Sequence, residues 1–398
     1  MFLNKIIQRN PKLIQTGVEL HQKGLIPANS YVLDIDTISY NAKLMAEEGE
    51  RYHLKVFAMT KQIGRNPVAI KAMVDAGIRA GVCVDMSDAR PMTASGMEIG
   101  HLGHLVQVPF AETKAAAKLN PRYWMVYNLE KAKAVSEVTD SGREQNIMVR
   151  IFGEDDSFYR GHEAGFPTET ILETAKEIQQ MKGLHFAGIA TFPAQLYDVE
   201  SKTVKATHNY NTLIKTADYL RNHGYPEIEV NAPGTTSSHI FKRLAEDGVI
   251  QVEPGHGLTG TTPIHAYEDM PEMPGYIYVS EVSHFYGGKP YCYGGGMYID
   301  PVFDDYDVQA CVGRDGDDAL KCQISCEMPK PKAIDYYGIL NPGKEQKINV
   351  GDTVVFGFRA QMFVTRAYVV PVSGISKNEP KVEGIYFTDG RRVGWPEW

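Results

Sequence analysis

The stretch VFAMTKQIGRNPVAIKAMVDAG, residues 56–77, contains one complete strand–loop–helix unit, and this unit decides the fold. Its apolar run ends at Lys61, and a Gly-Arg-Asn-Pro loop follows. Asn66 is then placed as the N-cap of a helix, with Pro67 in the first turn and Gly77 after the last. The apolar run is continuous rather than alternating, which is typical of a strand buried on both faces of a parallel sheet.

The same unit recurs along the chain between residues 55 and 255. Helical patterns such as PTETILETAKEIQQM separate short apolar runs, and the repeat predicts an α/β fold with an N-terminal (β/α)8 TIM-type barrel. The eight strands are predicted to end at Lys61, Asp85, Pro109 (in LVQVP), Asn128, Gly153, Thr191, Asn231 and Glu253.

After residue 265 the chain is rich in Tyr, Gly, Pro and Val, and helical periodicity nearly vanishes. This change predicts a C-terminal mostly-β domain over residues 266–398 that completes the active site, after a barrel over residues 29–265. Residues 1–28 are expected to form an amphipathic lead-in helix that packs on the β domain or on a partner.

Composition excludes several classes of protein. The net charge is −8 without a Lys/Arg block, which excludes a nucleic-acid or anionic-membrane surface. No apolar run is long enough to span a bilayer, and the start lacks the apolar core of a signal peptide. Five cysteines in a long chain fit reduced thiols, so we expect a cytoplasmic protein. No Cys-x-x-Cys pair, Gly-x-Ser-x-Gly elbow or nucleotide-binding fingerprint is present, and no metal is expected.

Polar residues at strand ends are the first candidates for chemistry, because barrel enzymes assemble their active sites at the carboxyl ends of the strands. Lys61, Asn231 and Glu253 occupy such ends. A lysine at an apolar barrel mouth loses hydration, which favours a neutral, nucleophilic amine that can form a Schiff base with an aldehyde. The alternative is a lysine that merely emerges into solvent where its strand ends.

Two loops at neighbouring strand ends look suited to a phosphate group. NAPGTTSSH, residues 231–239, offers backbone N–H groups and hydroxyls at a helix start, although an ordinary Ser/Thr cap has the same appearance. VEPGHGLTGTTP, residues 252–263, brings Gly255 and His256 to the next strand end, where Glu253 is placed to accept a hydrogen bond from a protonated ring nitrogen. The combination of a lysine, phosphate-binding loops and such a carboxylate is typical of a site that binds pyridoxal phosphate.

The stretches AMTKQIGRNP, NAPGTTS, EPGHGLTG and PYCYGGG (residues 290–296) occur in an order and spacing that resemble the alanine-racemase-like (fold-type III) pyridoxal-phosphate enzymes. The resemblance is closest to the YhfX subgroup and covers nearly the whole chain. It implies a pyridoxal 5'-phosphate cofactor, a small amino-acid or amine substrate, and a head-to-tail homodimer with shared active sites.

The resemblance also implies roles for individual residues. Lys61 matches the lysine that forms the internal aldimine and serves as one base, and Tyr293 matches the opposite-face base that comes from the partner subunit. Tyr293 could instead be a packed tyrosine of the β domain. The implied cofactor-binding residues are Lys61, Arg65, Thr191, Asn231, Gly234, Thr235, Thr236, Ser237, Glu253, Gly255, His256 and Tyr368, and the implied substrate-side residues are Glu163, Cys326 and Glu327.

Three departures from the racemase pattern bear on the reaction. Glu253 stands where racemases have an Arg against the pyridine nitrogen, and the decarboxylase branch of the fold resembles this chain there. Glu163 replaces the substrate-side Arg, and Thr191 replaces the histidine that stacks on the cofactor ring. His284 and Cys292 do not match the zinc-ligand spacing of related dehydratases.

The expected function is therefore a pyridoxal-phosphate-dependent amino-acid racemase or epimerase, an isomerase. Decarboxylation or a lyase reaction on the same fold is the alternative among enzymes. A non-catalytic protein of pyridoxal phosphate homeostasis is the alternative outside them. Such proteins resemble the barrel alone, so the additional β domain favours an enzyme.

Overall fold

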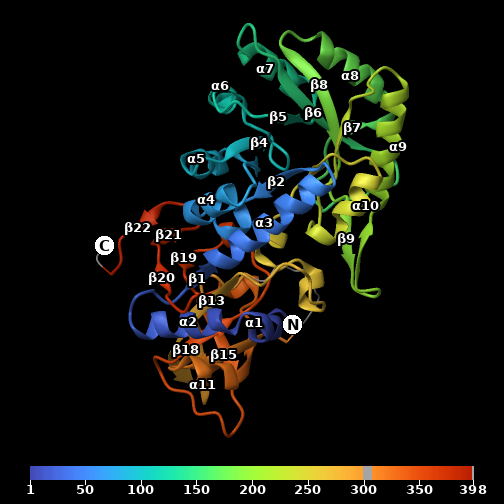
Figure 1. The fold of residues 1–398 in the computed structure, drawn as a ribbon. Helices are drawn as coiled ribbons and strands as arrows, with labels where there is room; N and C mark the ends of the chain where they lie inside the picture. Colours follow the sequence, from blue (N-terminus) through green and yellow to red (C-terminus); the bar gives the residue numbers. More distant parts are fainter. Residues whose placement is uncertain (299–306, 397–398) are drawn as a thin grey trace. The chain divides into compact units, whose positions relative to one another are not determined.

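The computed structural model describes residues 1–298 and 307–396 and divides into two compact units (Figure 1). The barrel unit comprises Lys43–Met59 and Val74–Gly255. The sheet unit comprises Met1–Ala42, Thr60–Met73 and His256–Trp398. Among the helices of the described residues, none combines the length and the apolar character that crossing a membrane requires.

Eight parallel strands form a closed ring in the barrel unit, in the order β2-β3-β4-β5-β6-β8-β11-β12, with β12 paired to β2. The predicted TIM-type barrel is thus confirmed. The strands are β2 (Lys55–Met59), β3 (Ala80–Cys83), β4 (Glu98–Leu102), β5 (Tyr123–Val126), β6 (Gln145–Phe152), β8 (Leu184–Ala190), β11 (Glu229–Asn231) and β12 (Gln251–Val252). Outside the ring, β7 (Phe166–Pro167) pairs with β6, and β9 (Gln195–Asp198) forms a hairpin with β10 (Thr203–Ala206).

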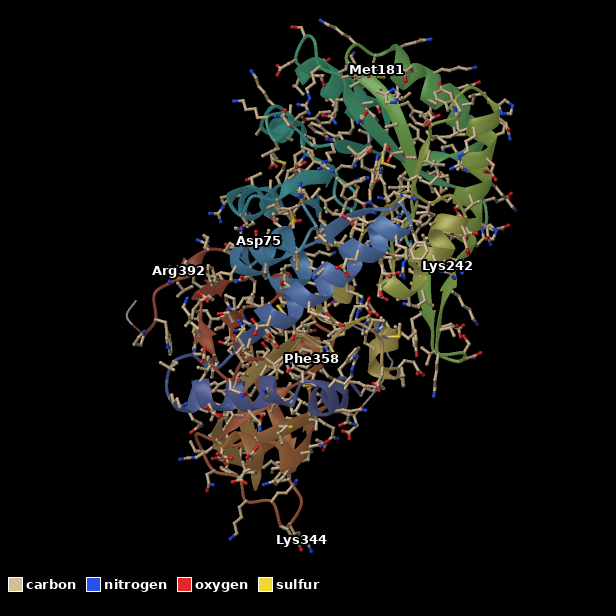
Figure 2. All side chains as sticks on the ribbon, viewed as in Figure 1. Asp75, Met181, Lys242, Lys344, Phe358 and Arg392 are labelled. Carbon is tan, nitrogen blue, oxygen red and sulfur yellow. The ribbon has the colours of Figure 1, made fainter. Side chains whose placement is uncertain are left out.

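Helices follow the strands because their sequences carry one apolar face. In α8 the buried residues are Ile171, Thr174, Ala175 and Ile178, which is the helical spacing of a single stripe. On α10 the labelled Lys242 is largely exposed (Figure 2). The helices are α3 (Ile35–Arg51), α4 (Pro67–Asp75), α5 (Met86–Ala94), α6 (Thr113–Ala117), α7 (Leu129–Val138), α8 (Ile171–Gln180), α9 (His208–Asn222) and α10 (Phe241–Glu246), of which α3 and α4 begin in the sheet unit.

One predicted strand is wrong. The stretch LVQVP, residues 105–109, is a loop, and the strand at this point of the ring is β4, residues 98–102. The loop conformation is held by Gln107, whose amide donates to the carbonyl of Met125 at 3.1 Å and accepts from the N–H of Tyr127 at 3.0 Å. An amide side chain thus takes the place that a neighbouring backbone would have in a sheet.

Apolar side chains fill the ring of the barrel unit. The cluster is formed by Phe57, Met59, Ala80, Val82, Val84, Tyr123, Met125, Met148, Ala187 and Ala190. These apolar side chains pack against one another inside the ring, as in other barrels of this type.

The sheet unit is built around one sheet in the order β14-β17-β16-β15-β18-β13-β1-β19-β21-β22, with β20 on β19 and a further β14–β13 pairing. Its pairs are antiparallel except β1 with β19, which is parallel. The strands are β1 (Ser30–Asp34), β13 (Tyr276–Tyr286), β14 (Lys289–Tyr293), β15 (Gln309–Gly313), β16 (Gln323–Glu327), β17 (Tyr337–Asn341), β18 (Thr353–Phe356), β19 (Tyr368–Ser373), β20 (Lys381–Val382), β21 (Ile385–Phe387) and β22 (Arg392–Val393).

Two helices, α1 (Phe2–Arg9) and α2 (Pro11–Gln22), pack on this sheet, where the sequence predicted one lead-in helix. Leu13, Ile14 and Val18 share an apolar core with Ile277 of β13 and Val370 of β19. A third helix of this unit, α11 (Gly316–Lys321), contacts α2 and begins at the N-cap Asp315.

The division into units differs from the expected boundaries, because three stretches of the predicted barrel domain, residues 29–42, 60–73 and 256–265, belong to the sheet unit. Residues 30–34 were expected in the barrel domain, but β1 lies between β13 and β19 in the sheet unit. The reason is that SYVLD is buried along its whole length in this sheet, so its continuous apolar run has the same pattern as a barrel strand.

Candidate active site

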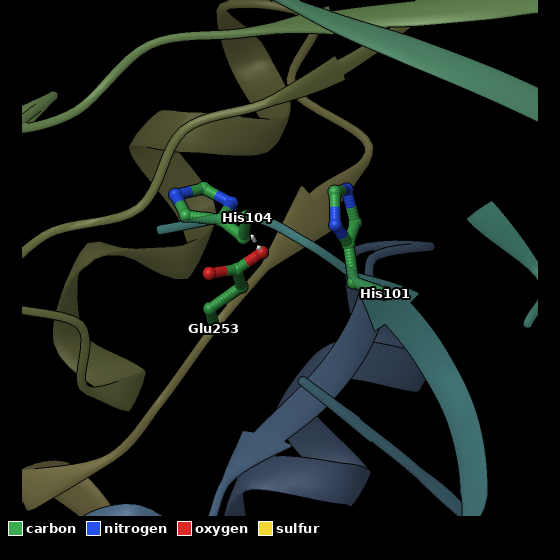
Figure 3. A group of neighbouring side chains, drawn as sticks. All are labelled: His101, His104 and Glu253. Atoms are coloured by element: carbon green, nitrogen blue, oxygen red, sulfur yellow. Dashed lines mark ion pairs between the residues drawn. The ribbon is translucent and has the colours of Figure 1, made fainter. Parts of the chain in front are cut away.

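The carboxyl end of the barrel strands holds a buried polar group, the Glu253 cluster, made of His101, His104, Asn231 and Glu253. Figure 3 shows His101, His104 and Glu253 of this cluster. Asn231 ends β11 and donates through Nδ2 to Oε1 of Glu253 at 2.8 Å. His104 follows β4, and its Nδ1 lies 3.3 Å from the same carboxylate oxygen. Oε2 of Glu253 is buried without a hydrogen-bond partner among the described residues.

The cluster keeps Glu253 ionised. Burial by itself raises the pKa of this carboxyl, but the charges of His104 and His101 and the bonds from His104 and Asn231 outweigh burial and lower the pKa to about 2. Burial lowers the pKa of His101 to about 4, against the attraction of Glu253. Its Nε2 faces the sulfur of Met148 at 3.3 Å. The result is a buried anion with one free acceptor oxygen.

A chain of hydrogen bonds connects this cluster to the amino ends of the strands. Asn231 Nδ2 also donates to Oε1 of Gln251 at 3.1 Å, and Gln251 Nε2 donates to Oε2 of Glu229 at 2.7 Å. Glu229 in turn accepts from Lys55 and from the hydroxyl of Tyr123. Because Gln251 fixes which way the Asn231 amide faces, it also fixes the donor that Glu253 receives.

The ligand-type atoms of His101, His104 and Glu253 all lie within 4.8 Å of one another, a grouping that can also hold a metal ion. Asn231 donates a hydrogen bond to one oxygen of the Glu253 carboxylate, and a carboxylate that binds a metal ion would not need this bond. The expectation of no metal stays a prediction, and metal analysis of the purified protein tests it.

Two cations of the sheet unit share one aromatic ring. Lys61 comes two residues after β2 and opens the short helix η1 (Lys61–Ile63), and its Nζ lies 5.1 Å from the ring centroid of Phe363. The guanidinium of buried Arg65 lies 5.5 Å from the same centroid, and Arg65 has a positive φ of 52°. The structure therefore brings Lys61 and Arg65 together.

His256 belongs to the same unit. Its Nε2 lies 2.8 Å from the carbonyl of Ala360. Burial lowers its pKa well below the usual range, and the charges of Arg359 and Lys61 add to that effect. The ring is therefore neutral and fixed by a backbone acceptor, while Gly255 before it ends the barrel unit.

The loop expected to hold a phosphate has an unusual backbone. Gly234 has φ of 130° and Thr235 has φ of 42°, a region that few residues other than glycine adopt. The hydroxyl of Thr236 bonds the Gly234 carbonyl at 3.4 Å, and Ser237 bonds Nδ1 of His239 at 2.9 Å. A non-glycine residue with positive φ is a strained position of the kind found in ligand-binding loops.

The remaining predicted residues have contacts of their own. Tyr293 ends β14 with 39% of its surface exposed, and its ring lies 5.8 Å from that of Tyr337. Tyr368 begins β19 beside Phe387 at 5.9 Å. Glu163 is exposed and pairs with Arg160 at 3.1 Å.

Cys326 is buried in β16, which ends at the exposed Glu327. Its thiol hydrogen-bonds with that of Cys292, and this bond together with burial raises the pKa of Cys326 well above its usual range. This thiol is therefore protonated.

Three residues at the carboxyl end of the barrel strands were not predicted from the sequence: His101, His104 and Arg150. The two histidines belong to HLGH, residues 101–104, where an i, i+3 pair around a Gly is the signal that could have found them. Arg150 is an arginine inside an otherwise apolar strand run, MVRIF, and that is a signal for a buried cation.

Comparisons with known proteins agree on one family. A family model described as the alanine racemase N-terminal domain matches residues 33–263, and one described as the YhfX-like C-terminal domain matches residues 277–382. The chain belongs to the alanine-racemase-like family. It is 36% identical over 395 residues to a protein of Escherichia coli (strain K12) named "Uncharacterized protein YhfX", covering 99% of this chain and 100% of that protein.

Solved structures of alanine-racemase-like proteins share the fold of this chain. D-threonine aldolase from Filomicrobium marinum has a TM-score of 0.68 at 17% identity and covers 92% of this chain and 95% of its own. Alanine racemase of Clostridium difficile 630 in complex with cycloserine has 0.62 at 14%, over 90% and 98%. D-threo-3-hydroxyaspartate dehydratase from Delftia sp. HT23 has 0.62 at 15%, over 93% and 98%. Several activities thus occur on one fold.

The polar atoms of the barrel unit fit the cofactor that the sequence resemblance implies. Oε2 of Glu253 and the hydroxyl of Thr191 are both buried, and neither has a hydrogen-bond partner among the described residues. A buried polar atom without a partner is costly unless a ligand or water completes it. A pyridine ring with a protonated nitrogen and a polar substituent offers groups of the required kind.

Proposed function

We propose that this protein is a pyridoxal-5'-phosphate-dependent enzyme that acts at the α-carbon of an amino acid, by racemisation or epimerisation. The observation that carries the proposal is Glu253, a buried and ionised carboxylate with one acceptor oxygen left over. A carboxylate in this state favours a proton on a ring nitrogen. The protonated cofactor ring, when bound, supplies the electron sink that makes the α-proton removable.

The chain's own residues take distinct roles in this proposal. Lys61 would hold the cofactor through its amine and would move the α-proton on one face. Glu253 holds the ring-nitrogen proton, and Asn231 and His104 hold Glu253. Gly234, Thr235, Thr236 and Ser237, with the backbone of Gly255 and His256, would hold the phosphate.

The second base in the proposal is Tyr293 of the partner subunit, in a head-to-tail homodimer. The support is exposure: Tyr293 is 39% exposed, and on β13 and β17 Tyr286 is 74% and Tyr337 39% exposed. Exposed aromatic side chains at this density are typical of surfaces that meet a partner. Tyr368, Cys326, Glu327 and Glu163 remain candidates for the cofactor and substrate surroundings.

A decarboxylase or lyase is the second candidate, and the same carboxylate favours it. A ring whose nitrogen is protonated stabilises a carbanion more fully than a racemase with Arg at that position requires. The fold is also that of an aldolase and a dehydratase. A non-catalytic cofactor-handling role is the third candidate. The presence of the sheet unit with its exposed Tyr293 favours an enzyme over this third candidate.

The test starts with the cofactor. Purified protein is loaded with pyridoxal 5'-phosphate, reduced with borohydride and digested, and mass spectrometry locates the modified lysine. We expect the label on the peptide containing Lys61 and none after Lys61→Ala. The matched control is Lys71→Ala, which removes an exposed lysine on α4 and should leave the label on the Lys61 peptide. Label elsewhere would refute the role of Lys61.

The reaction is then read from a panel of L- and D-amino acids in D2O. α-Deuterium gain with loss of chirality identifies a racemase or epimerase, and Tyr293→Phe should then slow exchange from one enantiomer more than from the other. Mass loss or cleavage identifies the decarboxylase or lyase. A labelled Lys61 with no change in any compound would contradict the enzyme proposal for this panel.

A further inference from the structure

Two imidazoles and a carboxylate meet at the carboxyl end of the barrel strands. His101 lies in β4, His104 follows that strand, and Glu253 comes directly after β12. One nitrogen or oxygen atom of each residue lies within 4.8 Å of the corresponding atoms of the other two, and Nδ1 of His104 is 3.3 Å from Oε1 of Glu253. Figure 3 shows both rings next to the carboxylate. All three residues belong to the barrel unit.

These side chains leave part of their hydrogen-bonding capacity unused. Nδ1 of His101, Nε2 of His104 and Oε2 of Glu253 are buried, and within residues 1–298 and 307–396 none of these atoms has a hydrogen-bond partner. At most 4% of the surface of each residue is exposed. An unpaired buried polar atom is costly, and one ligand shared by several such groups removes much of that cost.

The spacing of the three side chains suits a metal ion. Nitrogen and oxygen ligands lie about 2.0–2.2 Å from zinc, so two ligands of one tetrahedral ion are about 3.3–3.5 Å apart. His104 and Glu253 already have this separation, at 3.3 Å. Since no separation in the group exceeds 4.8 Å, side-chain shifts of about 1.5 Å bring all three ligands to one ion. Three protein ligands leave a fourth position open.

The ligand types select the class of ion. Two imidazoles and a carboxylate suit zinc and other divalent transition metals, whereas Mg2+ and Ca2+ prefer oxygen ligands and Cu+ prefers sulfur. The hydrogen bond from Asn231 to Oε1 of Glu253 leaves room for an ion, because a carboxylate oxygen has more than one lone pair and metal-bound carboxylates are commonly hydrogen-bonded as well. Tyr127 donates its hydroxyl to the carbonyl of His104 and so holds the loop that contains this histidine.

We infer that His101, His104 and Glu253 bind a divalent transition-metal ion of the zinc type. No metal was expected from the sequence, because that expectation rested on short motifs, whereas this group joins β4 to β12. The metal site does not rest on the proposed function, but its consequence for the cofactor does. An ion on Oε1 of Glu253 brings a positive charge close to the ring-nitrogen proton that this carboxylate would hold. The ion and pyridoxal 5'-phosphate should therefore weaken each other's binding by the same factor.

Cobalt(II) is the probe, because its visible spectrum reports the geometry and the type of its ligands. Cofactor-free protein is stripped of metal with a chelator and titrated with Co2+, and Zn2+ or Mg2+ is then added as a competitor. We expect a single Co2+ per chain, a spectrum without a thiolate charge-transfer band, displacement by Zn2+ and no displacement by Mg2+.

The variants remove one ligand at a time. His104→Gln and Glu253→Gln should each weaken Co2+ binding by more than the about 10- to 100-fold typical of residues that only support a ligand. The matched control is His265→Gln. His265 is equally buried, and its Nε2 lies 3.4 Å from Oε2 of Glu272, but in the part of the chain that the structure describes this pair has no third ligand. The control should bind Co2+ as the wild type does.

Circular dichroism first establishes that each variant is folded, and His101→Gln takes the place of Glu253→Gln if the latter is not. A crystal grown with Zn2+ and measured at the zinc absorption edge then locates the ion, and we expect the anomalous peak between His104 and Glu253. Binding that survives both ligand variants, or that has a thiolate band, lies elsewhere, for example at the hydrogen-bonded thiols of Cys292 and Cys326, and would overturn the inference.

A last titration separates this inference from the proposed function. Pyridoxal 5'-phosphate is titrated into the wild type with and without saturating Zn2+, and we expect it to bind at least about 10-fold more weakly with the ion present. If the wild type binds no pyridoxal phosphate but binds Co2+ through His104 and Glu253, the proposed function fails and the metal site stands. If the cofactor labels Lys61 but the wild type binds Co2+ no better than His104→Gln does, the metal site fails and the proposed function stands.

Discussion

Replacing Glu253 by Gln should destabilise the cofactor-free protein, because the carboxylate is a buried anion that accepts a hydrogen bond from Asn231 and pairs with His104 at the same oxygen. Asn231 Nδ2 lies at 2.8 Å and His104 Nδ1 at 3.3 Å from Oε1. The amide is close in shape to the protonated acid, so the pKa gives the size of the effect. The difference between 4.5 and about 2 corresponds to about 3 kcal/mol at about 1.4 kcal/mol per unit.

The hydrogen bonds lead to a similar value for the loss in the free energy of unfolding. A bond to a charged acceptor contributes about 1.5–3 kcal/mol, and an amide at this position either weakens the bond from Asn231 and the pairing with His104 or turns its NH2 toward another donor. We therefore expect a loss of about 2–4 kcal/mol in the free energy of unfolding for Glu253→Gln. Because the folded pKa is depressed, this contribution is present above pH 4.5 and is lost as the pH falls toward 2.

The assay is urea unfolding of cofactor-free, metal-free protein at pH 7.5, followed by circular dichroism. Hydrogen exchange of peptides that cover β11 and β12 reports on the barrel unit itself. The matched control is Glu98→Gln, since Glu98 lies on the same ring of strands but in an exposed pair with Arg122 that contributes at most about 1 kcal/mol. A loss for Glu253→Gln no larger than that of the control would refute the reasoning.

Two further perturbations test other parts of the molecule. Burial lowers the pKa of His21 from 6.5 to about 4, although Glu281 lies 3.3 Å away, so stability is full above pH 6.5 and falls toward pH 4. Urea unfolding of the wild type should therefore lose about 2 kcal/mol between pH 8 and pH 5 that His21→Gln does not lose, whereas exposed His185→Gln should follow the wild type. Gly234→Ala places a Cβ 2.6 Å from the carbonyl oxygen of Gln195 at a φ of 130° and should cost about 1–3 kcal/mol in urea unfolding and weaken pyridoxal phosphate binding. Gly224→Ala, at a φ of 103° with open space around it, has strain without the clash, and an equal loss there would show that the close approach is unimportant.

The sequence predicts the barrel because most of its strands are continuous apolar runs between capped helices. It fails at β4, where EIGHL carries Glu, Gly and His, residues that seldom mark a strand, while LVQVP has the composition of one. Residue composition reports burial and propensity, and it does not show that Gln107 would tie the LVQVP loop to β5 through its side chain.

The candidate site likewise contains some residues that the sequence predicts and others that it does not. Lys61, Asn231 and Glu253 are predictable because a polar residue directly after an apolar run is visible in one dimension. His101 and His104 come close to Glu253 only because the strands close into a ring, since more than 140 residues of sequence separate β4 from β12. Arg150 was overlooked because one charge in an apolar run is easily taken for a strand with a solvated edge, and its burial depends on Phe158 and Tyr127.

The place of β1 in the middle of the C-terminal sheet has a consequence for how this protein is made. During synthesis, residues 30–34 and the apolar faces of α1 and α2 leave the ribosome well before β13 and β19, the two strands that flank β1. These segments must stay uncovered, or be held by a chaperone, until the last third of the chain has emerged. A fragment cut at the edge of the second family match, residue 277, would leave β13 and β19 with open backbone edges facing each other. Any attempt to express the C-terminal third alone should therefore carry residues 1–34 in trans or fused to its end.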